Sequence, residues 1–219
     1  MFEIVVRVVI AIALGYFMGG IPFGVIVGRR LGVDITALGS GNTGATNVFR
    51  TMGWRPALAV ALLDVAKGAV PALAARFLLA DVAWGVNARD LLLITVAGAA
   101  MAGHMFSPYF RFRGGKGVAT AAGGILVLMP EAFLVLLVVF VALVLVFRIV
   151  SVSSILTAFV FPVAIALLYH DRPVLFGFAI VAVPMIVWSH RANIGRLLRG
   201  EEPRITMARA TSGSKKERQ

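Results

Sequence analysis

Long apolar stretches alternate with short polar segments along the whole chain. A window of about 20 residues, the length of a helix that crosses a bilayer, finds apolar stretches at 4–28, 56–80, 91–110, 117–129, 131–148, 153–169 and 173–189. We therefore predict an all-α integral membrane protein with seven transmembrane helices. The fourth stretch is short, and Pro130 and Glu131 require a sharp turn after it, so five full spans plus a re-entrant pair is the alternative.

The apolar stretches and the polar segments between them form one polytopic domain, which we place at residues 1–203. Residues 204–219 are polar and basic and have no apolar periodicity. Such a composition predicts a basic, disordered cytoplasmic tail near anionic lipid headgroups.

The composition excludes several classes of protein. Hydrophobic residues make up 60% of the chain and charged residues only 14%, which is unlike a soluble domain. The formal net charge is +11, but its basic residues are spread among loops between apolar stretches, so nucleic acid is not an expected partner. With no cysteine, the chain has no disulfide, thiolate metal site or thioester intermediate. We expect no metal ion and no cofactor, and a monomer.

The basic residues predict an orientation. Arg29, Arg50, Lys116, Arg148 and the basic C-terminal segment fall on one side of a seven-span topology, whereas the opposite connections carry mixed charges. Because Lys and Arg concentrate in cytoplasmic loops, the N-terminus is predicted outside and the C-terminus in the cytoplasm. All the glycine-rich polar segments then face the cytoplasm.

The first polar segment, residues 39–50, has the sequence GSGNTGATNVFR. Its glycines allow backbone N–H groups to approach a ligand closely, its Ser, Asn and Thr side chains add short donors, and Arg50 adds a guanidinium. These features suit a phosphate.

The second polar segment, residues 103–120, contains a Gly-Gly-Lys-Gly turn at 114–117 immediately before an apolar stretch. Free N–H groups at a helix start, the helix dipole and the Lys116 amine would hold a phosphate together. A nucleotide P-loop is excluded, because the spacing G-x-x-x-x-G-K-[ST] is not met and no strand precedes the turn.

The third polar segment, residues 190–202, is basic and is either a surface anchor or part of the same site. The serines at 151, 153 and 154 either cap a helix or bind a substrate. Asp64 and Lys67 share a helix face at membrane depth, as a structural ion pair, a loop tether or a substrate contact. His104 and His190 lie on the cytoplasmic side and can orient a substrate phosphate or take part in catalysis.

Taken together, the motifs GSGNTGATNVFR at 39–50, GHMF at 103–106, FRGGKGVAT at 112–120 and HRANIGRLLRGE at 190–201 resemble the bacterial acyl-phosphate:glycerol-3-phosphate acyltransferases, the PlsY family. The resemblance follows the whole chain in order. Two departures are the Ser107-Pro108 pair, where the family has Pro directly after Phe, and Ala192, where the family often has an acidic residue.

This resemblance implies transfer of a fatty acyl group from acyl phosphate to the 1-hydroxyl of glycerol 3-phosphate, giving lysophosphatidic acid and phosphate. That reaction is the first step of phospholipid synthesis. The implied location is the bacterial cytoplasmic (inner) membrane, with a multi-pass chain, an active site that faces the cytoplasm, and glycerol 3-phosphate, acyl phosphate and membrane lipid as partners.

The resemblance also implies residue roles. Contacts to glycerol 3-phosphate are expected from Ser40, Arg50 and Lys116, and a phosphate is expected on the Gly114, Gly115 and Gly117 turn beside His104. The acyl phosphate or the reacting centre is expected near Asn42, Thr46, Asn47, Ser154, His190 and Asn193. The catalytic set so implied is Ser40, Asn42, Lys116, His190 and Asn193.

The chain lacks a recognisable catalytic base, because neither His104 nor His190 is followed by Asp at the fourth position. Our hypothesis is direct attack of the glycerol hydroxyl on the acyl carbonyl, with a substrate phosphate oxygen taking the proton. A transporter for an organic phosphate is the alternative from another class. It is disfavoured because the polar motifs all lie on one face.

Overall fold

A computed structural model describes residues 1–205, and these are helical apart from short connections. The α-helices are α1 (Phe2–Gly20), α2 (Phe23–Arg30), α3 (Ala45–Met52), α4 (Trp54–Leu78), α5 (Val86–Met105), α6 (Val118–Leu128), α7 (Pro130–Phe147), α8 (Val150–Leu168), α9 (Pro173–Ser189) and α10 (Arg191–Leu198), with a 3-10 turn η1 (Pro108–Phe110). Each predicted apolar stretch contains a helix. The chain is thus an all-α, multi-span membrane protein.

Five segments of the described chain are long and apolar enough to cross a bilayer: Phe2–Arg30, Trp54–Leu78, Val86–Phe110, Pro130–Phe147 and Val150–Leu168. The pair α9 and α10, bent by 58°, is a sixth candidate. Helix α6 has only 11 residues, so it is about 16 Å long and covers roughly half of the hydrocarbon core. The number of full spans and their orientation stay predictions.

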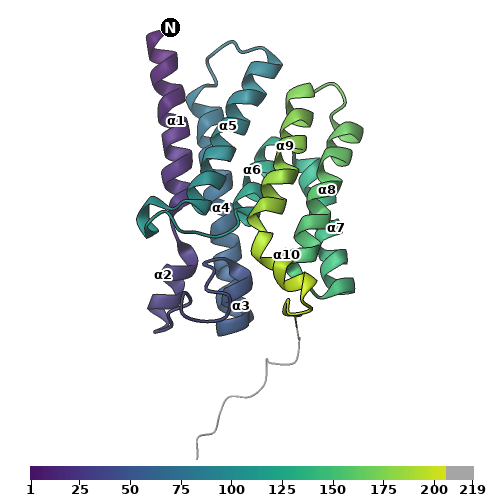
Figure 1. Ribbon diagram of the computed structural model, residues 1–219. Coiled ribbons are helices and arrows are strands. Elements are labelled where there is room, and N and C mark those ends of the chain that lie inside the picture. The colour runs from purple at the N-terminus through teal and green to yellow at the C-terminus, as the bar shows by residue number, and fades with distance from the viewer. Residues whose placement is uncertain (206–219) are drawn as a thin grey trace, which may run out of the picture.

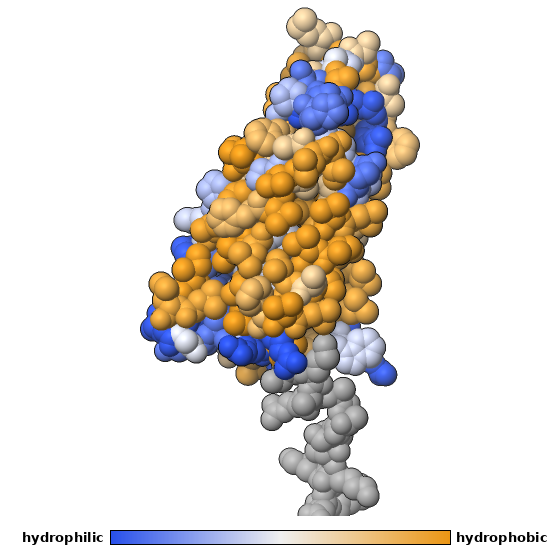
Figure 2. Space-filling view, turned by 90° about the vertical axis from the view of Figure 1, so that its right-hand side faces the viewer, coloured by the Kyte–Doolittle hydropathy of each residue, from blue (hydrophilic) through white to orange (hydrophobic). Residues whose placement is uncertain are grey.

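The surface has the pattern expected of a bilayer-embedded protein. In Figure 2, apolar side chains cover a broad middle zone, and hydrophilic residues gather towards both ends. In Figure 1, the N-terminus lies at one end of the bundle, whereas α2, α3 and α10 lie at the other. Helices α2 and α3, on either side of the first glycine-rich segment, therefore lie at the same end of the bundle as α10.

The first predicted stretch, 4–28, is interrupted in the structure. Helix α1 ends at Gly20, and α2 begins at Phe23 after Ile21 and Pro22. Proline lacks a backbone N–H and disfavours helical dihedrals in the residue before it, and Ile21 is accordingly extended, with φ −59° and ψ 118°. The break leaves the Ile21 carbonyl free to accept a hydrogen bond from the Lys67 amine of α4, at 2.8 Å.

Close contacts between helix backbones set the depth of the second polar segment. A Cβ atom added to Gly68 of α4 would lie 1.9 Å from the Thr120 carbonyl oxygen of α6. Gly68 is near the middle of α4, so α6 starts part-way along the bundle and not at its end. The end of the segment 106–117, at the buried Gly117, therefore reaches into the bundle where α6 begins.

The packed structure continues slightly past the predicted domain boundary at 203. Ile205 donates its backbone N–H to the Arg148 carbonyl at 2.7 Å, so Arg204 and Ile205 belong to the ordered part of the chain. The rest of the predicted tail, residues 206–219, lies outside the described residues.

We expect Gly68→Ala to destabilise the protein, because the methyl group would force α4 and α6 apart at a backbone contact. Overpacking of this kind costs about 1–3 kcal/mol. The midpoint of thermal unfolding in detergent should fall. Gly98→Ala on α5 is the matched control, since a Cβ atom there meets no atom within 4 Å. Equal midpoints for the two variants would contradict the close α4–α6 contact.

Candidate active site

A buried carboxylate, Glu202, joins three elements that are distant in sequence. Its oxygen Oε1 accepts hydrogen bonds from Ser151 Oγ of α8 at 2.9 Å and from Asn193 Nδ2 of α10 at 2.6 Å. Its oxygen Oε2 accepts from Arg196 Nε at 2.7 Å, and Arg50 Nη2 of α3 lies 3.8 Å from Oε1. The carboxylate thus holds α3, α8 and α10 together at one end of the bundle.

The chain after α10 folds back over this carboxylate. Glu201 donates its N–H to the Arg196 carbonyl at 2.8 Å, and Arg50 Nη2 donates to the Pro203 carbonyl at 3.2 Å. The side chain of Glu202 is only 1% exposed. This strap therefore fixes the guanidinium of Arg50 relative to the third polar segment.

Arg50, Lys116 and Arg196 bring three positive charges to the neighbourhood of the Glu202 carboxylate. Burial lowers the pKa of the Lys116 amine to about 8; the Glu202 charge opposes this shift, and the Arg196 and Arg50 charges add to it. Burial also lowers the pKa of Arg50, against the attraction of Glu202. For Glu202, burial raises the pKa, but hydrogen bonds from Asn193, Arg196 and Ser151 outweigh it and bring the pKa below its usual value. The cluster carries an excess of positive charge and is suited to an anion.

The first polar segment is shaped by Asn47. Its side-chain oxygen accepts the Ser40 N–H at 2.9 Å, and its amide nitrogen donates to the Ile35 and Leu38 carbonyls at 3.0 and 3.1 Å. Gly39 has φ +60°, and a Cβ atom there would lie 2.3 Å from Asn47 Oδ1. Asn47 was expected near the acyl phosphate, but its buried amide is occupied by the loop. It presents Ser40, which is exposed.

Two further residues of this segment keep their side chains near the start of α3. Asn42 Oδ1 accepts the Gly44 N–H at 2.9 Å, which leaves the Asn42 amide nitrogen free to donate. Thr46 lies half-buried in the first turn of α3. Their contacts to a substrate stay predictions.

The second polar segment lies on the end of α5. Gly115 donates its N–H to the His104 carbonyl at 3.2 Å, so this N–H is not free for a phosphate as we expected. His104 is only 6% exposed and its ring lies against the Gly-Gly turn; its contact with a substrate stays a prediction. Gly114 also packs against the His104 carbonyl. Gly117 has φ +77° and directly precedes α6.

The third polar segment places His190 at the junction of α9 and α10. Its Nδ1 lies 2.8 Å from the Ile186 carbonyl oxygen, which can only accept, so Nδ1 carries the hydrogen and Nε2 of the neutral ring is an acceptor. Asn193 is partly committed, because its Nδ2 donates to Glu202. Ser154 is buried on α8, at 6% exposure, and its contact with a substrate stays a prediction.

An apolar groove opens beside this end of the bundle. It has a volume of about 350 Å³ and is lined by side chains from the ends of α5 and α9: Ala102, Met105, Phe106, Val181, Pro184, Met185 and Trp188. Trp188 is two residues from His190, and Met105 and Phe106 follow His104. The groove therefore begins where the second and third polar segments begin.

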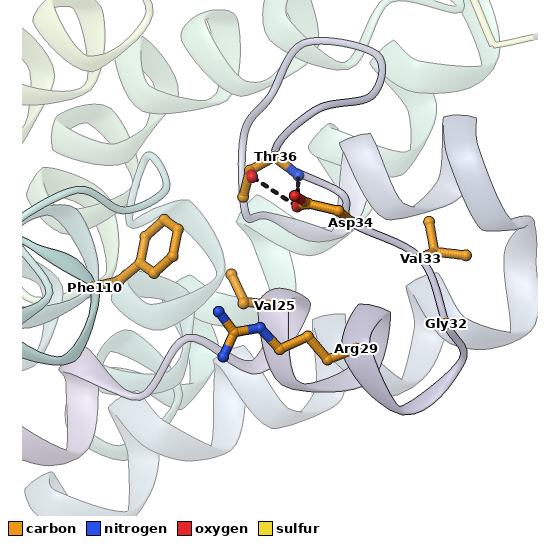
Figure 3. A pocket seen from close by; sticks show the side chains of 7 residues that line it. All are labelled: Val25, Arg29, Gly32, Val33, Asp34, Thr36 and Phe110. Carbon is orange, nitrogen blue, oxygen red and sulfur yellow. Dashed lines mark hydrogen bonds between the residues drawn. The ribbon is translucent and has the colours of Figure 1, made fainter.

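A separate cavity of about 270 Å³ lies between α2, the connection that follows it and Phe110 of the second polar segment. Figure 3 shows the Arg29 side chain of α2 and the Phe110 ring of the second segment facing it from different elements. Asp34 closes a turn by accepting from the Thr36 N–H and hydroxyl at 3.0 and 2.6 Å. The cavity therefore lies between the residues that precede the first polar segment and the second segment.

Sequence reasoning missed the central carboxylate. Glu202 and Arg196 were not among the expected site residues, and Ser151 was named only as a helix cap or a substrate contact, although all three organise the cluster. Two acidic residues, Glu201 and Glu202, stand in an otherwise basic segment, and this contrast was the available signal. Within residues 1–205, no group of three or more His, Asp or Glu side chains is placed to hold a metal ion.

Known proteins similar to this chain match it along almost its whole length. The family model for glycerol-3-phosphate acyltransferase matches residues 9–200. The glycerol-3-phosphate acyltransferase of Synechococcus sp. (strain CC9902) is 43% identical, over 89% of this chain and 93% of its own. The Thermus thermophilus enzyme is also 43% identical, over 88% and 92%.

Solved structures agree with these relatives. The crystal structure of PlsY, an integral membrane glycerol 3-phosphate acyltransferase, in its glycerol 3-phosphate form has a TM-score of 0.82 and 34% identity, and covers 91% of this chain and 96% of that one. The lysophosphatidic acid form of PlsY has a TM-score of 0.80 at the same identity. With its motifs, fold and length in agreement, the chain belongs to the glycerol-3-phosphate acyltransferase family, in which it resembles PlsY.

Proposed function

We propose that this chain transfers an acyl group from acyl phosphate to the 1-hydroxyl of glycerol 3-phosphate, forming lysophosphatidic acid and inorganic phosphate. One observation carries the proposal: a cluster of Arg50, Lys116 and Arg196 around the single carboxylate Glu202 has positive charge in excess. Both proposed substrates carry a phosphate group, and a partly desolvated cation cluster would bind both anions strongly.

The position of the apolar groove supports a lipid-like donor. Its lining comes from the ends of α5 and α9, next to the second and third polar segments. An acyl chain in this groove would lie within the bilayer while its phosphate reached the cations, and glycerol 3-phosphate would enter from the aqueous side. The glycerol 3-phosphate and lysophosphatidic acid forms of PlsY are consistent with such a pair of substrate and product.

The chemistry needs no covalent enzyme intermediate. The 1-hydroxyl oxygen attacks the acyl carbonyl carbon, the bond between that carbon and the phosphate oxygen breaks, and phosphate leaves with the electron pair. A phosphate oxygen of a substrate takes the hydroxyl proton, because its second pKa is about 6. Ser40, Asn42 and Asn193 would orient the reactants, and the Lys116 amine would balance the charge on the leaving phosphate.

The same proposal includes a direction in the membrane. The first and third polar segments lie at one end of the bundle with α2, α3 and α10, and the second polar segment, between α5 and α6, lies part-way along the bundle on its way to α6 (Figure 1). The excess of Arg and Lys there favours the cytoplasmic side of a bacterial inner membrane, with the N-terminus outside. Glycerol 3-phosphate would then reach the site directly from the cytoplasm.

The donor is tested with purified protein in detergent. Labelled glycerol 3-phosphate is incubated separately with acyl phosphate, acyl-CoA and the acyl carrier protein thioester. We expect lysophosphatidic acid with acyl phosphate alone. If product forms only with acyl-CoA or the thioester, that compound is the donor in place of acyl phosphate. If no product forms with any of the three, the acyltransferase assignment is refuted.

The proton acceptor is tested with His190→Ala. If substrate phosphate is the base, the variant keeps measurable turnover. The acidic limb of its pH–rate curve should keep its midpoint at about pH 6, the second pKa of phosphate. His170→Ala, in the α8–α9 connection at the opposite end of the bundle, is the control and should match the wild type. Complete loss of turnover at unchanged substrate affinity would make the imidazole the base.

The pKa of Lys116, lowered to about 8 by burial, predicts a pH dependence of binding. The ammonium form is present below this pKa and is lost as the pH rises through it, so KM for glycerol 3-phosphate should increase roughly tenfold between pH 7 and pH 9. Lys116→Arg keeps its charge over this range and should remove the increase. A wild-type KM that stays constant from pH 7 to pH 9 would contradict the role of this amine.

A further inference from the structure

A buried polar cluster lies in the middle of the bundle, away from Glu202. It consists of Asp64 and Lys67 of α4, His104 of α5 and Thr120 of α6, each at most 6% exposed. Lys67 Nζ is 2.8 Å from Asp64 Oδ1. Ionised groups at membrane depth are expensive and are retained where they serve a function, so this central cluster requires an explanation.

One edge of the His104 ring is held by this cluster. Its Nδ1 lies 3.1 Å from Thr120 Oγ1 and 3.7 Å from Asp64 Oδ1. Asp64 is held in turn by Lys67, which also donates to the Ile21 carbonyl at the break between α1 and α2. Contacts from α4 and α6 therefore fix the orientation of the imidazole.

The opposite edge of the ring supports the Gly-Gly turn. A Cβ atom added to Gly115 would lie 2.0 Å from His104 Nε2, and one added to Gly114 would lie 1.9 Å from the His104 carbonyl oxygen. The same carbonyl accepts the Gly115 N–H at 3.2 Å. The turn thus rests directly on His104, and the next residue is Lys116.

We infer that His104 is a positioning residue: with Asp64, Lys67 and Thr120 it sets the height of the Gly114–Gly117 turn and hence the place of the Lys116 amine in the cation cluster. The imidazole does this through Gly115 and does not itself touch a substrate. The inference rests on the proposed function and deepens it, because it assigns a task to a histidine that the chemistry leaves unused. A shift of the turn by about 1 Å would be enough to lower activity on the order of 100-fold.

The test is a pair of substitutions that compensate each other. Gly115→Ala places a methyl group against Nε2 and should lower kcat/KM for glycerol 3-phosphate on the order of 100-fold, mainly through KM. Adding His104→Ala removes the ring that the methyl group meets. The double variant should recover at least about tenfold over Gly115→Ala, since residues in direct contact are not additive.

If His104 bound a substrate directly, the double variant would not be more active than Gly115→Ala. Loss of a ligand on top of Gly115→Ala would leave the double variant no better than the worse single variant, and this result would overturn the inference. Gly98→Ala is the control for a glycine substitution as such. Gly98 lies on α5, the helix of His104, and a Cβ atom there meets no atom within 4 Å, so this variant should behave as wild type.

A second pair of variants covers the case in which the double variant does not fold. Thr120→Val removes the Oγ1–Nδ1 contact with little change of shape and should raise KM for glycerol 3-phosphate severalfold while kcat changes less. Thr120→Ser keeps the hydroxyl and should restore the wild-type KM. Equal KM values for Thr120→Val and wild type would overturn the inference.

These outcomes are separable from the donor assignment. Wild-type turnover with acyl phosphate supports the proposed function whatever the variants do. If the wild type is active and the double variant shows no recovery, only the positioning role fails. Lack of wild-type turnover with acyl phosphate rejects the proposed donor.

Discussion

The Glu202 carboxylate has lost almost all contact with water, and its stability there depends on Ser151, Asn193, Arg196 and Arg50. A buried charge of this kind costs several kcal/mol unless it is paired and hydrogen-bonded. Its partners come from α3, α8 and α10, so the carboxylate can be buried only when these three helices pack around it. Arg50, the last charged residue of the first polar segment, is held in this way beside the third segment.

Because one carboxylate faces several cations, this arrangement also leaves charge uncompensated. The lowered pKa of Lys116 is the physical sign that burial and neighbouring cations disfavour its charged form. A bound phosphate would offset the repulsion from Arg50 and Arg196 and favour the charged form of the amine. The same interaction therefore stabilises the fold through Glu202 and creates a preference for anions.

At several positions in this molecule, glycine allows a close contact that a side chain would block. At Gly68 it lets α4 meet the Thr120 backbone, and at Gly115 it lets the turn rest on the His104 ring. At Gly39 it combines a positive φ with room for the Asn47 amide. Together these contacts bring the second polar segment into the bundle, where the ends of α5 and α9 form an apolar groove.

The amino-acid sequence by itself determined the membrane class, the helical stretches and the presence of three polar segments, because these depend on local hydropathy and on residue types at short spacing. The resemblance of its motifs also predicted that Arg50, Lys116, His190 and Asn193 belong to one site. Only the tertiary structure assigned Asn47 to the loop backbone, His104 to the floor of the Gly-Gly turn and Glu202 to the centre of the cations. The Glu202 cluster depends on contacts between residues up to about 150 positions apart, which arise from helix packing. The Asn47 and His104 contacts join residues close in sequence, but they depend on the three-dimensional path of the loop, which no local pattern encodes.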